Sequence, residues 1–203
     1  KLAETKDVIR GCLGIYFDAT ASAPTTSPGQ QVKVRLEAIN RSALDVQLNA
    51  LSIRPSLKDT TTAFALINNK GFILNTSITI PENARYTAPY WLQKAATIGM
   101  YNVEDQLLRG VPETPRYATV RWMLTVQGIP IEYESEIAYK VGESSIGEVW
   151  RPFEVLPPVF VECTESSYIF SDKEKNVSIR LKAGADNISG TAGVQVPAGW
   201  VVS

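Results

Sequence analysis

Aromatic and amide side chains gather in one turn-rich stretch, TAPYWLQKAATIGMYNVEDQLLRGVPE, which covers residues 87–113. Tyr90 and Trp91, together with Gln93, have the residue types of a sugar-binding platform, because flat rings cover the apolar face of a pyranose while an amide binds its hydroxyls. The same rings also suit a plug at the end of a β-sandwich, together with Leu92. The sequence favours the plug, so we expect Trp91→Ala to lower stability by about 3–5 kcal/mol.

Three carboxylates alternate along one expected strand, at Glu132, Glu134 and Glu136. Side chains two residues apart share one face of a strand and lie about 7 Å from each other, whereas the carboxylate pair of a glycosidase flanks a cleft. The row therefore predicts a solvated strand face, and an enzyme that uses it is the weaker hypothesis. The stretch GESSIGE, residues 142–148, lacks the G-x-S-x-G spacing of a nucleophile elbow and predicts a polar loop.

The chain of 203 residues contains no histidine, which excludes a Ser-His-Asp or Cys-His nucleophile and a His-ligated zinc site. It has two cysteines, Cys12 and Cys163, which is too few for a cysteine-rich metal cluster. Their apolar surroundings favour two buried free thiols over a disulfide. We therefore expect no catalytic residue, no metal and no cofactor in this chain.

Net charge and hydropathy bear on the partners of the chain. A net charge of −1 at pH 7 gives no attraction to nucleic acid or to an anionic membrane surface. No apolar run approaches the ~20 residues that span a bilayer, and the first residues have no apolar signal-peptide core. Because the sequence starts at Lys1, we expect a mature or excised piece of a longer protein. Four N-x-S/T sequons fall mostly at turns or strand ends, which favours a structural role over glycosylation; they begin at Asn40, Asn75, Asn176 and Asn187.

Alternating apolar residues predict an all-β fold. The alternation is clear in QVKVRLEA, ALDVQLNALSI, GFILNTSITI, YATVRWMLTV and IPIEYESEIAYK. A phase shift within residues 43–53 predicts a β-bulge, and the turn residues of INRSA predict a hairpin that pairs this stretch with residues 31–38. The first strand is expected within residues 10–24, and no segment shows a helical period. Short strands between Pro, Gly and Asn turns predict an Ig-like antiparallel β-sandwich over residues 1–156.

The Pro-Pro pair at residues 157–158 predicts a boundary, because proline donates no ladder hydrogen bond and stiffens the chain. Strand patterns follow in PVFVEC, SYIFS, NVSIRLKA and GVQV, and the third places Val177, Ile179, Leu181 and Ala183 inward. Residues 157–203 amount to less than half of a ~100-residue Ig-like domain, so we expect a partial second Ig-like unit. Its apolar face is expected to pack on the first domain or on another copy of the chain, which would form a homo-oligomer.

An ordered series of motifs resembles the C-terminal region of Bacteroidetes-type proteins that carry an N-terminal PIG-L/LmbE-like N-acetylglucosaminyl deacetylase domain. The series is Pro-Tyr-Trp-Leu at residues 89–92, Gly-Glu-x-x-Arg-Pro at residues 147–152 and Pro-Pro-Val at residues 157–159. The terminal VPAGWVVS is also similar to the Pro-x-Gly-Trp turn of Ig-like modules that accompany secreted glycosidases.

The resemblance implies an exported parent protein, which is secreted, periplasmic or held at the cell surface, with this chain as its non-catalytic accessory region. The zinc chemistry of the family uses a His-Pro-Asp-Asp motif and a further histidine, so no catalytic residue is carried over to a chain without histidine. The implied partners are the N-terminal catalytic domain of the same parent chain and a glycan. The alternative is a carbohydrate-binding module that presents Tyr90, Trp91 and Gln93 on its surface.

Overall fold

The structure is a computed structural model that describes residues 1–56, 58–171 and 174–202. The chain divides into two compact units, Lys1–Leu156 and Pro157–Ser203. The elements of the first unit are α1 (Leu2–Leu13), β1 (Tyr16–Ala21), β2 (Thr25–Thr26), β3 (Gln31–Ile39), β4 (Val46–Arg54), β5 (Lys58–Ala65), β6 (Gly71–Thr79), the 3-10 helices η1 (Tyr90–Leu92) and η2 (Gln106–Leu108), β7 (Thr119–Val126), β8 (Ile129–Glu136), β9 (Ala138–Glu143), β10 (Gly147–Pro152) and β11 (Glu154–Val155).

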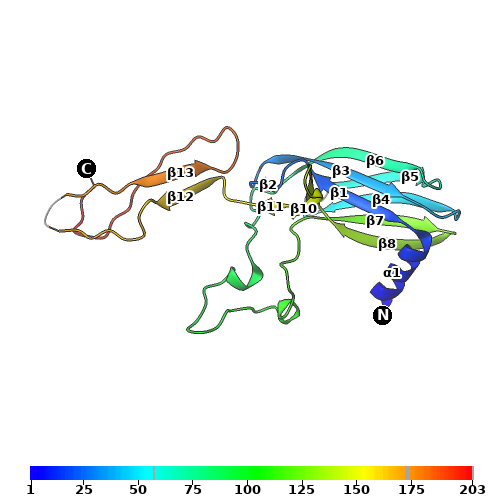
Figure 1. Ribbon diagram of the computed structural model, residues 1–203, viewed down its shortest axis with the longest axis horizontal. Helices are drawn as coiled ribbons and strands as arrows, with labels where there is room; N and C mark the ends of the chain where they lie inside the picture. The colour runs from blue at the N-terminus through cyan, green and yellow to red at the C-terminus, as the bar shows by residue number, and fades with distance from the viewer. Residues whose placement is uncertain (57, 172–173, 203) are drawn as a thin grey trace. The chain divides into compact units, whose positions relative to one another are not determined.

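The first unit is a β-sandwich, which confirms the predicted all-β fold (Figure 1). One main sheet has the strand order β10-β9-β1-β3-β6, and the other has the order β5-β4-β7-β8. Neighbouring strands in both sheets are antiparallel except for β1 and β9, which are parallel. A short parallel pair formed by β2 and β11 adds to the same unit.

The hydrophobic core is built from the inward faces of the two main sheets. The predicted inward faces of residues 31–38 and 117–126 are confirmed, because Leu36 on β3 and Trp122 and Leu124 on β7 are almost completely buried. The predicted β-bulge is also confirmed, since the register of β4 shifts between Leu48 and Ala50. Period-two alternation thus identified which side chains enter the core.

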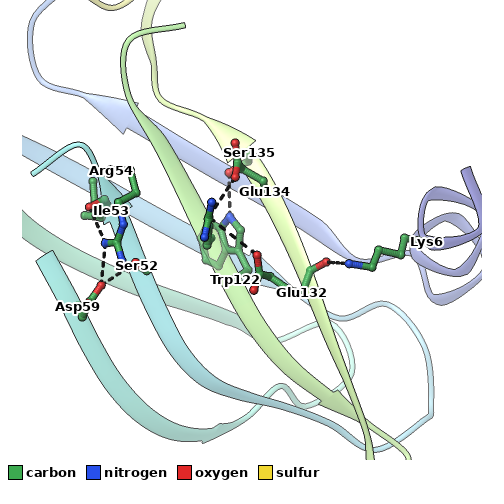
Figure 2. Close-up of polar contacts among 10 residues, drawn as sticks. Lys6, Ser52, Ile53, Arg54, Asp59, Trp122, Glu132, Glu134 and Ser135 are labelled. Atoms are coloured by element: carbon green, nitrogen blue, oxygen red, sulfur yellow. Dashed lines mark hydrogen bonds and ion pairs between the residues drawn. The ribbon is translucent and has the colours of Figure 1, made fainter. Parts of the chain in front are cut away.

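Trp122 is the largest side chain that the core buries completely. Its indole N–H donates a hydrogen bond of 2.8 Å to Ser135 Oγ on the neighbouring strand β8 (Figure 2). The ring stacks on Phe17 of the opposite sheet, with a centroid distance of 4.6 Å. A buried indole needs a partner for its single donor, and Ser135 supplies it.

The predicted solvated strand face is confirmed for the carboxylate row on β8. Glu132, Glu134 and Glu136 are all exposed. Arg121 Nε lies 3.9 Å from Glu132 Oε1 and 3.2 Å from Glu134 Oε2, so both glutamates share one guanidinium. Arg116 Nε lies 3.4 Å from Glu136 Oε2. The row is therefore used in exposed ion pairs.

A smaller polar cluster lies on strands β4 and β5 of that sheet, where Asp59 Oδ1 accepts hydrogen bonds from Ser52 Oγ at 2.6 Å and from Arg54 Nη1 at 2.8 Å (Figure 2). These bonds favour the ionised carboxylate and lower the pKa of Asp59. Because this pKa is lowered in the folded state, the contribution of Asp59 to stability is present at neutral pH and is lost as the pH falls through the lowered value.

The predicted hairpin between residues 31–38 and 43–53 is wrong. β3 pairs with β1 and β6, whereas β4 pairs with β5 and β7 in the other sheet, so the connection crosses between the layers. Asn40 organises this crossing and is buried: its Nδ2 donates to Leu44 O at 3.2 Å and to Leu66 O at 2.9 Å, and its Oδ1 accepts from the Ser42 N–H at 2.9 Å. The first sequon therefore has a structural role, because this side-chain amide is already engaged.

The expectation of no helix is wrong, because residues 2–13 form α1. The first strand expected within residues 10–24 is confirmed, because β1 covers residues 16–21. The helix ends at Gly14, which adopts a left-handed conformation with φ 57°, and its N–H bonds to Gly11 O. Lys6 Nζ donates to Glu132 O at 3.0 Å, and Tyr133 Oη donates to Lys6 O at 3.1 Å. Local capping and these tertiary contacts outweigh a weak apolar period. No helix in the described part of the chain has the length and apolar character needed to cross a membrane.

The second unit contains one antiparallel pair, β12 (Val159–Cys163) and β13 (Ile179–Ala183), among its described residues. The strands expected at residues 167–171 and 193–196 are not present there. The predicted inward face is wrong, because Ile179 and Leu181 are exposed, and a two-stranded sheet has no second layer to bury them. Cys12 and Cys163 are free, as predicted, but both are exposed rather than buried.

Candidate functional site

The structure places the three residues expected to act as a ligand face or a plug in and beside η1, on the long connection between β6 and β7 (Figure 1). Tyr90 and Trp91 are half-buried, whereas Leu92 and Gln93 are exposed. The prediction that Tyr90, Trp91 and Leu92 plug the sandwich is therefore wrong. The core strands fill the interior of the sandwich with their own side chains, and Trp91 is not part of that core.

Hydrogen bonds tie the connection to β11 at Thr87 and join its two halves at Tyr90. The Thr87 N–H and the Thr87 hydroxyl both donate to Val155 O, at 2.8 Å and 2.9 Å, and the Val155 N–H returns a bond of 2.7 Å to Thr87 Oγ1. The Tyr90 N–H donates to Thr114 Oγ1 at 3.1 Å, and Tyr90 Oη donates to Val111 O at 3.0 Å. Tyr90 is thus held at both ends.

Tyr90 in turn positions Trp91. The two rings meet edge to face, with a centroid distance of 4.9 Å and an interplanar angle of 88°. This is the arrangement that aromatic quadrupoles favour. Because Tyr90 is tied to the backbone, the indole of Trp91 is held in place before any ligand arrives, which reduces the ordering cost of binding.

Trp91 opens onto a groove of about 430 Å³, which we call the aromatic groove. Its apolar lining includes Tyr117, Trp150 and four prolines, and its polar lining includes Thr87, Glu113, Thr114, Arg116 and Glu154. Three segments form its walls: residues 87–91, residues 112–117, and strand β10 with the residues after it. A concave surface with flat apolar walls and a few polar groups is typical of a site for a small organic ligand.

One guanidinium in the aromatic groove is fixed by two carboxylates. Arg116 Nη2 donates to Glu113 Oε2 at 2.6 Å, and Arg116 Nε lies 3.4 Å from Glu136 Oε2. Burial raises the pKa of the neighbouring Tyr117 above its usual value, so its phenol keeps its proton at neutral pH. The groove therefore offers a fixed cation, carboxylates and a neutral phenol to a ligand. The described residues contain no group of three or more His, Cys, Asp or Glu side chains that could hold a metal ion.

The sequence pointed to Trp91 but missed Trp150, which is 48% exposed on β10. A local signal was present, because alternation along residues 147–152 places Trp150 opposite to Val149 and leaves a large indole on the outward face. Gln93 does not line the aromatic groove, so the structure brings together Trp91 and Trp150 in place of the expected trio.

Comparison with known proteins adds a weak structural likeness. No protein-family model and no curated protein matches the chain. Among solved structures, the chain is similar to Spo0M, a sporulation control protein from Bacillus subtilis, with 12% sequence identity and a TM-score of 0.31. The match covers 61% of this chain and 48% of that protein, so it spans about half of its length.

Proposed function

We propose that this chain is a non-catalytic accessory region of an exported carbohydrate-active protein, and that its aromatic groove binds a saccharide. The parent would be a protein with a PIG-L/LmbE-like deacetylase domain, which the series of motifs at residues 89–92, 147–152 and 157–159 resembles. One observation carries the proposal: the first two of these motifs, distant in the sequence, both line the aromatic groove through Pro89, Trp91, Trp150 and Pro152. A common binding surface explains why both motifs belong to one series.

The chemistry of the groove suits a sugar ring. The C–H face of a pyranose is apolar and packs on an indole or a proline ring, while its equatorial hydroxyls need charged or polar partners at the rim. Trp91 and Trp150 offer flat apolar surfaces to the C–H face. Arg116, Glu113 and Thr114 offer charged and polar partners to the hydroxyls. An accessory region of this kind would hold a glycan beside the catalytic domain of the same parent chain.

We expect Trp91→Ala and Trp150→Ala each to weaken saccharide binding about tenfold or more, because each removes one stacking surface. The purified chain would be titrated with N-acetylglucosamine oligomers, the sugar class on which the deacetylase domains act, and binding measured by calorimetry. Trp200→Ala is the matched control, since Trp200 is 51% exposed in the second unit and lies outside the groove.

Three results would contradict the proposal. If the oligomers do not bind the native chain, the aromatic groove is not a saccharide site and only a structural role is left for the chain. Equal affinities of the native chain and the Trp91→Ala variant would show that the saccharide binds outside the aromatic groove. Release of acetate from the same oligomers by the purified chain would show that it is catalytic.

A further inference from the structure

A second groove, of about 640 Å³, lies on the outer face of the five-stranded sheet. Inward residues of β1 and β3 are apolar, so alternation turns the polar residues between them outward. Register then places Thr20 opposite Arg35, Arg35 opposite Asn75, and Lys33 opposite Ser77. These five residues and Lys58 define what we call the cationic groove.

The cationic groove is positively charged. It is lined by Lys33, Arg35 and Lys58 and by no carboxylate. Glu37 lies just outside the groove on the same face, and its Oε2 pairs with Arg35 Nη1 at 2.7 Å. The other guanidinium N–H groups of Arg35 are left for a ligand. Within the described residues, Lys33 and Lys58 form no ion pair within 4.0 Å. Cations that converge in a concave surface focus a positive potential on it.

Lys58 is also held in position. Its Nζ donates a hydrogen bond of 2.7 Å to Ser77 O on the edge strand β6, so its side chain reaches from one sheet to the other. The ammonium has two further N–H donors. An anion that meets a fixed ammonium pays less ordering entropy than one that must immobilise a free lysine.

The two grooves share one face of the sheet. β10 pairs with β9, and Trp150 lies opposite Lys140, so both point outward. Lys140 Nζ lies 5.0 Å from the centroid of the Trp150 ring and 3.6 Å from Asp18 Oδ2, two residues before Thr20 on the same face of β1. Adjacent strands are about 4.8 Å apart, so the path from β10 to β6 measures about 19 Å. An extended chain can cross this face from one groove to the other.

We infer that the natural ligand is an acidic polysaccharide with uronate carboxylates, which stacks one sugar between Trp91 and Trp150 and pairs its carboxylates with Lys33, Arg35 and Lys58. This inference rests on the proposed function and adds the charge and the length of the ligand. Hydroxyl and amide groups of Thr20, Asn75 and Ser77 meet the sugar hydroxyls between carboxylates. Each contact of a carboxylate with an ammonium or guanidinium is a charge-assisted hydrogen bond.

The test compares two glycans that differ in charge. Hyaluronan oligomers alternate N-acetylglucosamine with glucuronate, and chitin oligomers of the same length contain N-acetylglucosamine alone. At about 0.01 M salt, where charges act over about 30 Å, we expect the native chain to bind hyaluronan about tenfold more tightly or better. At about 1 M salt, where the range falls to about 3 Å, the two affinities should converge.

Variants locate the effect. Lys33→Gln with Lys58→Gln should remove the preference for hyaluronan and leave the affinity for chitin oligomers unchanged. The matched control, Lys70→Gln with Lys182→Gln, removes the same charge from positions outside the groove and should keep the preference.

Each outcome separates the inference from the proposed function. Equal binding of the two glycans would overturn the inference and leave the proposed function standing. Binding of chondroitin sulfate without hyaluronan would also overturn it, because the ligand group would then be a sulfate ester. If the Lys33→Gln, Lys58→Gln variant still prefers hyaluronan, the carboxylates of the ligand bind outside the cationic groove. Failure of both glycans to bind would overturn the proposed function itself.

Discussion

Trp122→Ala is expected to lower the free energy of unfolding by about 3–5 kcal/mol, the cost of truncating a large aromatic side chain in a core. The substitution removes a fully buried indole, its stacking on Phe17 and its hydrogen bond to Ser135. The rigid sheets on both sides can refill only part of the space. Urea denaturation of the native and variant chains, followed by circular dichroism, measures the change.

Two variants show whether burial is the cause. Trp150→Ala truncates an indole that is about half exposed, so it should lower stability by about 1 kcal/mol or less. Ser135→Ala leaves the indole N–H of Trp122 without its partner and should cost about 1–3 kcal/mol. A Trp122→Ala chain with the denaturation midpoint of the native chain would show that Trp122 is not part of a packed core.

Period-two alternation was enough to predict from the sequence which side chains of the sandwich strands enter the core. It placed Leu36, Trp122 and Leu124 in the core, because a strand that is buried on one face must alternate. The same alternation is silent about which strands pair. Residues 31–38 and 43–53 are compatible with a hairpin and with a crossing between layers, and the choice depends on the buried amide of Asn40 and its bonds to Leu44 O and Leu66 O.

The candidate site was predictable in part for a similar reason. Trp91 can be identified from the local sequence alone, because an aromatic pair in a polar, turn-rich stretch indicates either a binding surface or a packing role. Trp150 comes to line the same groove only through the fold, because Thr87 is tied to Val155 by hydrogen bonds that no local pattern encodes. For the second unit, the prediction failed for a different reason. Alternation correctly marked two stretches as strands, but a single pair of strands provides no second layer that could bury their apolar side chains.

Lys140→Met is expected to lower the free energy of unfolding by about 2–3 kcal/mol. Asp18 is buried on the outer face of β1, its Oδ1 has no hydrogen-bond partner among the described protein atoms, and its Oδ2 lies 3.6 Å from Lys140 Nζ. Removing the ammonium leaves a desolvated carboxylate without a cation, which is costly even though Lys140 itself is partly exposed. Urea denaturation at pH 7 measures the loss.

Neutralising the carboxylate separates this cause from lost packing. Asp18→Asn in the Lys140→Met background should recover part of the stability, because a buried amide costs less than an unpaired charge. Burial alone would lower the pKa of Lys140, but the hydrogen bond to Glu148 and the charge of Asp18 outweigh it and raise the pKa above the ordinary 10.5. The contribution of Lys140 is therefore fully present below the ordinary value and is lost only as the pH rises through the raised one, so the deficit of Lys140→Met should be the same at pH 6 and pH 9. A double variant no more stable than Lys140→Met would show that the ammonium acts through its contacts with Trp150 and Glu148, and not through the buried charge of Asp18.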